Sequence, residues 1–123
     1  MLNSLNFTVA ISTFNRNEDL ERCLEALKTQ TYPDFDIVIS NGGEHQGVKQ
    51  VAEKFKGLKI KIVNQERKGI VEGRNLGWRN SRGDIVCLID DDLVVLPDWL
   101  VNIRSTFLSD ERIGGVSGPT IIP

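Results

Sequence analysis

The sequence predicts one α/β domain, built from a mostly parallel β-sheet with helices on both faces. Short β-rich apolar runs alternate with segments of helical hydrophobic spacing along the whole chain. Strands that alternate with helices in this way pair in parallel through right-handed crossovers. The length of 123 residues fits a single domain, 1–123, with one hydrophobic core.

The first strand and helix are expected between residues 7 and 31. Residues 7–12 are rich in apolar and β-branched side chains, which is typical of a strand. Asn15 or Asn17 can cap the next helix, because Asn side chains accept hydrogen bonds from the free amides of a first turn. Pro33 bars continuation, so the helix should end near residues 29–31. Its apolar face is spaced i, i+3, i+4, i+7 at Leu20, Cys23, Leu24 and Leu27.

A second strand and helix follow from residue 36. Residues 36–41, with Ile37, Val38 and Ile39 at their centre, are expected to form the strand, and Gly42 and Gly43 after them allow backbone to approach closely. Gly57 is the expected C-cap of the helix. That helix is indicated by the spacing of Val48, Val51, Ala52 and Phe55.

The third strand should lie near an edge of the sheet. Residues 58–64 alternate polar and apolar side chains, which is typical of a half-exposed strand. A helix is expected over residues 70–80, although two glycines interrupt it. Gly69, Gly73 and Gly77 recur every four residues, so they predict a smooth stripe on which another element packs closely.

The fourth strand leads into the main candidate site. Residues 85–89 are all apolar, as in a parallel strand buried on both faces, and Asp90, Asp91 and Asp92 follow directly. Pro97 suits the first turn of a last helix. Residues 114–119 are expected to form a short final strand and its exit.

The three aspartates predict a divalent-metal site, since the carboxyl edge of an open parallel sheet is where ligands bind. Carboxylates suit Mg²⁺ or Mn²⁺, which substrate phosphates commonly complete. If the segment stays extended, Asp90 and Asp92 point to one side and Asp91 to the other. We favour Asp92 as the metal ligand, with Asp90 as a second ligand or a sugar-hydroxyl partner. The simpler alternative is an acidic loop that only ends the strand.

The amino-acid composition limits the classes of partner and the cellular compartment that we expect. An apolar fraction of 40%, a charged fraction of 26% and a net charge of -2 describe an ordinary globular domain, with no basic run that would indicate nucleic acid. The two cysteines, Cys23 and Cys87, lack metal-ligand spacing and are expected to be buried free thiols in a reducing compartment. No signal peptide or membrane span is visible, so we expect a cytoplasmic protein, membrane-associated only through a longer parent chain.

Several motifs along the chain match those of a known family. Residues 9–16 look like the opening strand of that family and its end, and Gln30-Thr31-Tyr32 resembles its Q-T-Y helix end. Residues 73–77 are similar to A-R-N-x-G. Residues 89–92 and 96–100 look like the D-x-D motif and the helix after it. Taken together and in this order, over nearly the whole chain, these motifs resemble the family-2 glycosyltransferases of the GT-A fold.

The resemblance implies a Rossmann-like donor-binding half that binds a nucleotide-diphosphate sugar and, with a divalent metal, transfers the sugar to an acceptor hydroxyl. Thr13 and Phe14 would line the nucleobase pocket, and Arg74 would lie by the pyrimidine or diphosphate. Asn41 would occupy the base-recognition position. The remaining donor contacts are assigned to Asn15, Arg16, Gly42, Asp90 and Asp91, and the metal to Asp92 and Asp90.

Two departures from the family pattern bear on function. The family usually carries D-D-x-S after its second strand, whereas this chain has Ser40-Asn41-Gly42-Gly43. An amide both donates and accepts, so base identity is open, with uridine as the default. The catalytic base of the family is expected beyond Pro123, so this chain is expected to be inactive alone. A truncated sheet would also expose apolar surface and favour a homodimer.

Two other functions fit parts of the sequence. Residues 90–94 match the nucleophile motif of haloacid-dehalogenase-type phosphatases, which would use Asp90 and Asp92. That motif opens its domain, however, and here most of the chain precedes it. A non-catalytic nucleotide-sugar-binding module is the other alternative.

Overall fold

The structure, a computed structural model that describes residues 5–118, is built on a parallel sheet. Within those residues the sheet has four strands in the spatial order β3-β2-β1-β4, and every neighbouring pair is parallel. The predicted α/β class and the edge position of β3 are confirmed. The strands are β1 (Phe7–Thr13), β2 (Phe35–Asn41), β3 (Ile60–Asn64) and β4 (Ile85–Asp90).

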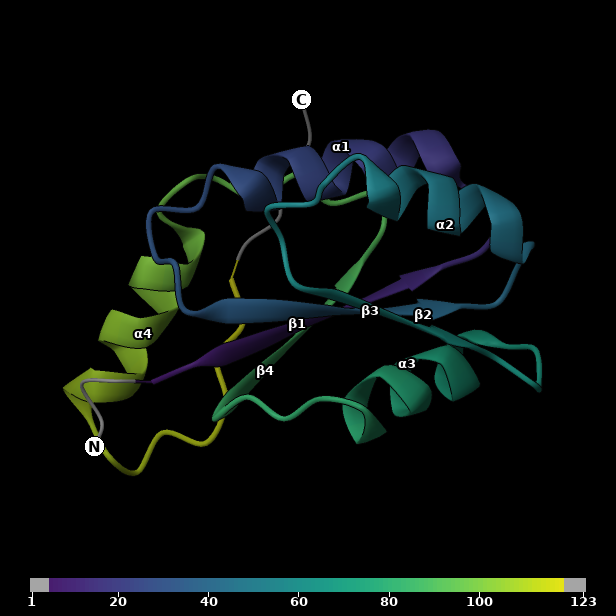
Figure 1. The fold of residues 1–123 in the computed structure, drawn as a ribbon. Coiled ribbons are helices and arrows are strands. Elements are labelled where there is room, and N and C mark those ends of the chain that lie inside the picture. The colour runs from purple at the N-terminus through teal and green to yellow at the C-terminus, as the bar shows by residue number, and fades with distance from the viewer. Residues whose placement is uncertain (1–4, 119–123) are drawn as a thin grey trace.

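Helices cover both faces of the sheet, as predicted. Figure 1 shows α1 and α2 side by side on one face, α3 on the opposite face and α4 beside the sheet. They span α1 (Asn17–Lys28), α2 (His45–Glu53), α3 (Ile70–Arg79) and α4 (Trp99–Ser109). Over the part of the chain that the structure describes, no helix combines the length and apolar character needed to cross a bilayer.

The main core lies between the sheet and the α1–α2 layer. Strand alternation in β1 directs Phe7, Val9 and Ile11 into this core, where each is fully buried. The predicted face of α1 is confirmed, because all four of its apolar side chains are buried there. On the other face, a Cβ on Gly77 would lie 3.3 Å from Ala10 Cβ, so this glycine lets α3 pack closely on β1. Gly69 precedes the helix with φ 125° and is therefore not part of the predicted stripe.

Two strand predictions are wrong. β4 is not buried on both faces, since Leu88 is 53% exposed. β4 is the last strand of the described sheet, and α3 packs mainly over β1 and β2. Residues 114–118 form no strand, and Pro119 lies outside the described residues.

Both predicted caps are also wrong. α1 begins after Arg16, which has no side-chain capping bond. Asn15 has φ 52°, and its Oδ1 accepts from the backbone N–H of Glu44 at 2.8 Å instead. α2 ends with Lys54 as its C-cap, before Gly57. The hydrogen-bonding capacity of Asn15 is thus used to hold the loop after β2.

Candidate functional site

The carboxyl ends of the strands meet at one edge of the sheet, as expected for parallel pairing. The register places Ser12 beside Ser40 on one side and beside Asp90 on the other. Thr13 at the end of β1 pairs with Asn41 at the end of β2. The polar side chains that end β1, β2 and β4 are therefore neighbours, although they are far apart in the sequence.

The three aspartates do not form one extended segment, because Asp90 is the last residue of β4 and Asp91 and Asp92 lie in the turn that follows. The strand ends at Asp90, and the N–H of Leu93 donates to the Asp90 carbonyl at 3.3 Å. The turn still separates the side chains: Asp90 and Asp92 are each about half exposed, whereas Asp91 is 4% exposed. The segment is not extended as the sequence prediction assumed, but Asp91 does lie apart from Asp90 and Asp92.

Asp91 is an internal carboxylate that joins the ends of β1 and β4. One of its oxygens accepts from Thr13 Oγ1 at 2.8 Å, and the other lies 3.8 Å from Arg16 Nη1. Burial raises the pKa of Asp91, while the hydroxyl of Thr13 and the guanidinium of Arg16 act to lower it. Removal from water disfavours the charged form, and each of these partners restores part of its stability.

Two arginines balance the exposed carboxylates. Arg74, from α3, approaches both oxygens of Asp90 at 3.3 and 3.4 Å. Arg16 binds Asp19 at 2.8 Å and lies 3.9 Å from Asp92. The hydrogen bond with Asp19, with a contribution from Asp91, raises the pKa of Arg16. Both guanidinium groups are half exposed and can exchange these partners for an anionic ligand.

A pocket of about 330 Å³ opens among these groups. It joins an apolar side, with the exposed ring of Phe14, to a charged side that holds both arginines and all three aspartates. Seven of its lining residues are predicted site residues: Thr13, Phe14, Arg16, Arg74, Asp90, Asp91 and Asp92. The others are Ser12, Gln65, Gly69, Ile70 and Gly73.

Three predicted site residues lie outside this lining. Asn15 holds the β2–α2 loop. Asn41 is 1% exposed, and its Nδ2 donates to Asn64 Oδ1 at 3.0 Å and to the Glu44 carbonyl at 3.2 Å. Gly42 lies close to the pocket, because a Cβ there would be 3.2 Å from Phe14 Cδ2.

Gln65 is the polar pocket residue that the sequence analysis missed. It directly follows β3, and its N–H donates to the Asn41 carbonyl at 2.8 Å. The rule that placed the other site residues, a polar side chain just after a predicted parallel strand, applies to it as well. Gln65 begins a basic loop that contains no known motif, so only its position after the strand marks it as a site residue.

The donor atoms suit a metal that is shared with a substrate. Across residues 5–118, no group of three or more acidic, histidine or cysteine side chains is arranged to hold a metal ion. Two exposed carboxylates, Asp90 and Asp92, do face the pocket. Mg²⁺ and similar ions are often held by one or two carboxylates plus substrate phosphates. The residues present therefore fit a divalent ion that arrives with a phosphate ligand.

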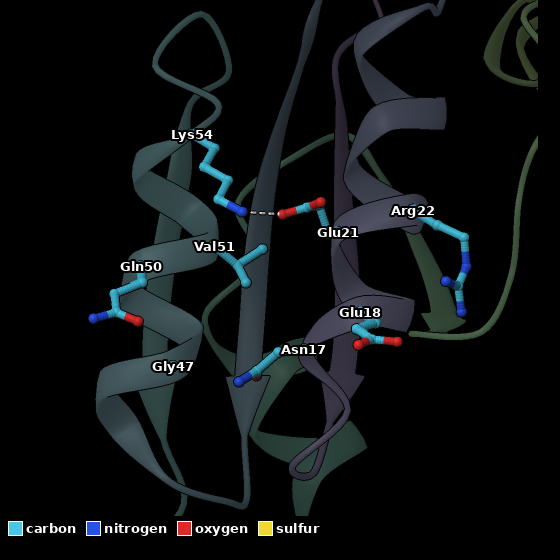
Figure 2. Close-up of a pocket in the computed structure, with 8 residues that line it drawn as sticks. All are labelled: Asn17, Glu18, Glu21, Arg22, Gly47, Gln50, Val51 and Lys54. Carbon is cyan, nitrogen blue, oxygen red and sulfur yellow. Dashed lines mark hydrogen bonds and ion pairs between the residues drawn. The ribbon is translucent and has the colours of Figure 1, made fainter.

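A larger hollow of about 500 Å³ lies elsewhere, between α1 and α2 (Figure 2). An ion pair between Glu21 and Lys54 connects its two walls. It has no cluster of like charges, and it contains no predicted site residue. Its lining comprises Asn17, Glu18, Glu21, Arg22, Gly47, Gln50, Val51 and Lys54.

Comparisons with known proteins find relatives and solved structures of similar fold. Glycosyltransferase AglE of Haloferax volcanii is 31% identical over 113 residues, which cover 86% of this chain and 37% of AglE. The mannosyltransferase PcManGT of Pyrobaculum calidifontis, solved with GDP-Man and Mn²⁺, has a TM-score of 0.78 and 25% identity over 89% of this chain and 34% of its own. TarS (residues 1–349) of S. aureus, solved with UDP-GlcNAc, has a TM-score of 0.77 and 20% identity, over 97% of this chain and 37% of its own.

The chain thus spans little more than a third of the length of these proteins. None of the comparisons supports the phosphatase alternative. The family profile described as "Glycosyl transferase family 2" matches residues 8–117, so the chain belongs to the family-2 glycosyltransferases.

Proposed function

We propose that the 330 Å³ pocket binds a nucleotide-diphosphate sugar, with a UDP-sugar as the expected donor. The observation that carries this proposal is the combination, in one pocket of a family-2 chain, of an exposed aromatic ring, two arginines and two exposed carboxylates. The nucleotide-sugar complexes of PcManGT and TarS, which contain GDP-Man and UDP-GlcNAc, support the same class of ligand.

The nucleobase and the diphosphate of the donor each have a chemical counterpart in the pocket. The ring of Phe14, 52% exposed, offers a flat apolar face for a nucleobase. Arg16 and Arg74 supply guanidinium groups that suit phosphate oxygens. Both arginines now lie near carboxylates, so diphosphate binding would give them phosphate oxygens as new partners, and the divalent ion would pair the carboxylates that they release.

Asp92 and Asp90 would hold Mn²⁺ or Mg²⁺. Such an ion supplies Lewis-acid stabilisation to a departing diphosphate. Asp91 is buried beneath the two and would fix the turn that presents them. Its bond to Thr13 ties this turn to the end of β1.

The transfer itself is proposed for a longer protein. In that protein a base from beyond Pro123 would remove the proton of the acceptor hydroxyl. This chain by itself would then bind the donor with little or no turnover. We also propose that the transferred group is a hexose and that the protein forms a homodimer. Its proposed location is the cytoplasm, with membrane association through a longer chain.

Calorimetry with UDP and Mn²⁺ tests donor binding. Asp92→Ala should weaken Mn²⁺-dependent UDP binding at least about tenfold, as expected when a hydrogen-bonded or ligating charge is lost at a binding site. Asp34→Ala is the matched control, since Asp34 is exposed and precedes β2 at the opposite edge of the sheet. Unchanged affinity and metal dependence in Asp92→Ala would show that the site is assigned wrongly.

A further inference from the structure

We propose that Gln65, and not Asn41, reads the nucleobase, and that its carbonyl oxygen selects bases with a ring N–H, such as uracil, over cytosine. This inference rests on the proposed donor-binding function. It assigns base recognition to a side chain that directly follows β3.

Each polar side-chain atom of Asn41 already has a partner among the described residues. Its Oδ1 accepts from the N–H of Gly43 at 3.0 Å. Its Nδ2 donates to Asn64 Oδ1 and to the Glu44 carbonyl, and the side chain is almost completely buried. These bonds fasten the β2–α2 loop to β3, so Asn41 supports the pocket from behind.

The side chain of Gln65 is held in one orientation. Its Nε2 donates to the carbonyl oxygens of Arg67 at 2.9 Å and Gly69 at 3.2 Å. Turning the amide over would place its oxygen against two other acceptors, so the bonding network fixes which end faces the pocket. Among the described residues no donor reaches Oε1 within hydrogen-bond geometry, and this oxygen is available to a ligand.

Two glycines make room for that oxygen. A Cβ on Gly42 would lie 2.7 Å from Gln65 Oε1, and a Cβ on Gly73 would lie 2.8 Å from it. The same Cβ on Gly42 would also lie 3.2 Å from Phe14 Cδ2. The amide oxygen and the aromatic ring therefore flank Gly42 on the pocket side, and a planar base stacked on Phe14 would present its edge to Oε1.

The hydrogen-bonding capacity of the Gln65 amide determines which nucleobases can pair with it. Gln65 offers one acceptor and no spare donor, because its two N–H groups are already used. Uracil has a donor at N3, whereas cytosine has an acceptor there and carries its donor on the exocyclic N4 amino group, so an Oε1 placed opposite N3 pairs with uracil and not with cytosine. An acceptor that faces an acceptor leaves both without a partner, which disfavours binding.

Calorimetry with UDP and CDP, on the full chain with Mn²⁺, tests the inference. The wild type should bind UDP more tightly than CDP. Gln65→Met keeps the length of the side chain but removes the amide, so UDP affinity should fall roughly three- to tenfold with little change for CDP. Gln50→Met, in the separate hollow between α1 and α2, should leave both affinities unchanged (Figure 2).

The ratio of the two affinities separates recognition from a structural role. If Gln65 only holds the loop at Arg67 and Gly69, Gln65→Met will weaken UDP and CDP equally, and the inference fails. Equal binding of UDP and CDP by the wild type also overturns it, while the proposed function stands. A wild type that binds neither nucleotide refutes the proposed function, and the inference with it. Melting temperatures confirm that each variant is folded.

Discussion

Replacing Thr13 with Val tests whether Asp91 is an internal anchor of the site. The Thr13 hydroxyl donates to a carboxylate that is 4% exposed, across 2.8 Å. Valine has nearly the same shape, so no cavity forms, but its methyl group cannot donate. Of the charged partners in residues 5–118, Asp91 would then retain Arg16, at 3.8 Å.

A hydrogen bond to a charged group contributes roughly 1.5–3 kcal/mol, so Thr13→Val should lower the free energy of unfolding by about that amount at pH 7. For a domain of this size, roughly 4 °C per kcal/mol applies, which predicts a fall in Tm of about 6–12 °C. Urea denaturation measures the free energy directly, and an unchanged m-value would show that the two-state comparison holds.

The loss of unfolding free energy in Thr13→Val should also depend on pH. The hydroxyl of Thr13 lowers the pKa of Asp91, so removing it raises that pKa further above the ordinary value of 3.8. A carboxyl whose pKa is raised by folding stabilises the fold when protonated, and this contribution is lost as pH rises through the folded-state value. The difference in stability between wild type and Thr13→Val should therefore grow as pH rises from about 4.

Two control experiments test whether the cost of Thr13→Val comes from the Asp91 carboxylate. In an Asp91→Asn background the cost of Thr13→Val should fall to about 1 kcal/mol, the value for neutral partners. Thr106→Val, at an exposed position whose hydroxyl bonds within α4, should change stability by less than about 0.5 kcal/mol. If Thr13→Val behaves like Thr106→Val, or costs the same with and without the Asp91 carboxylate, the anchoring role is refuted.

Two further predictions concern the fold. Gly83→Ala should destabilise the protein by about 1–3 kcal/mol, because the new Cβ would lie 2.4 Å from the backbone nitrogen of Thr8. Gly57→Ala should be nearly neutral, because a Cβ there would have no atom within 4 Å. If urea denaturation shows the same loss of stability for both variants, the close packing of Gly83 on Thr8 is contradicted. The thiols of Cys23 and Cys87 should resist iodoacetamide at pH 8 until the chain unfolds, since burial raises the pKa of each to about 12. Rapid labelling of the native protein, followed by mass spectrometry, would show that one of them is accessible.

The sequence alone was sufficient for the alternation of elements and for the edge at which the site forms. Hydrophobic spacing is a local property, so the buried face of α1 and the half-exposed β3 could be predicted from neighbouring residues. The position of three aspartates after an apolar run likewise placed them at the carboxyl edge of the sheet. The same reasoning failed for β4, because an apolar run does not say whether another element covers both of its faces.

What only the tertiary structure decided is which polar groups are used internally and which face the pocket. Asn41 and Asp91 lie at the carboxyl ends of strands just as Gln65 and Asp90 do, yet both are buried, and bonds to distant residues occupy them. A buried polar group is costly without partners, and those partners, Asn64 for Asn41 and Thr13 for Asp91, come from neighbouring strands. Strand order and register set these neighbours, and no local pattern in the sequence records them.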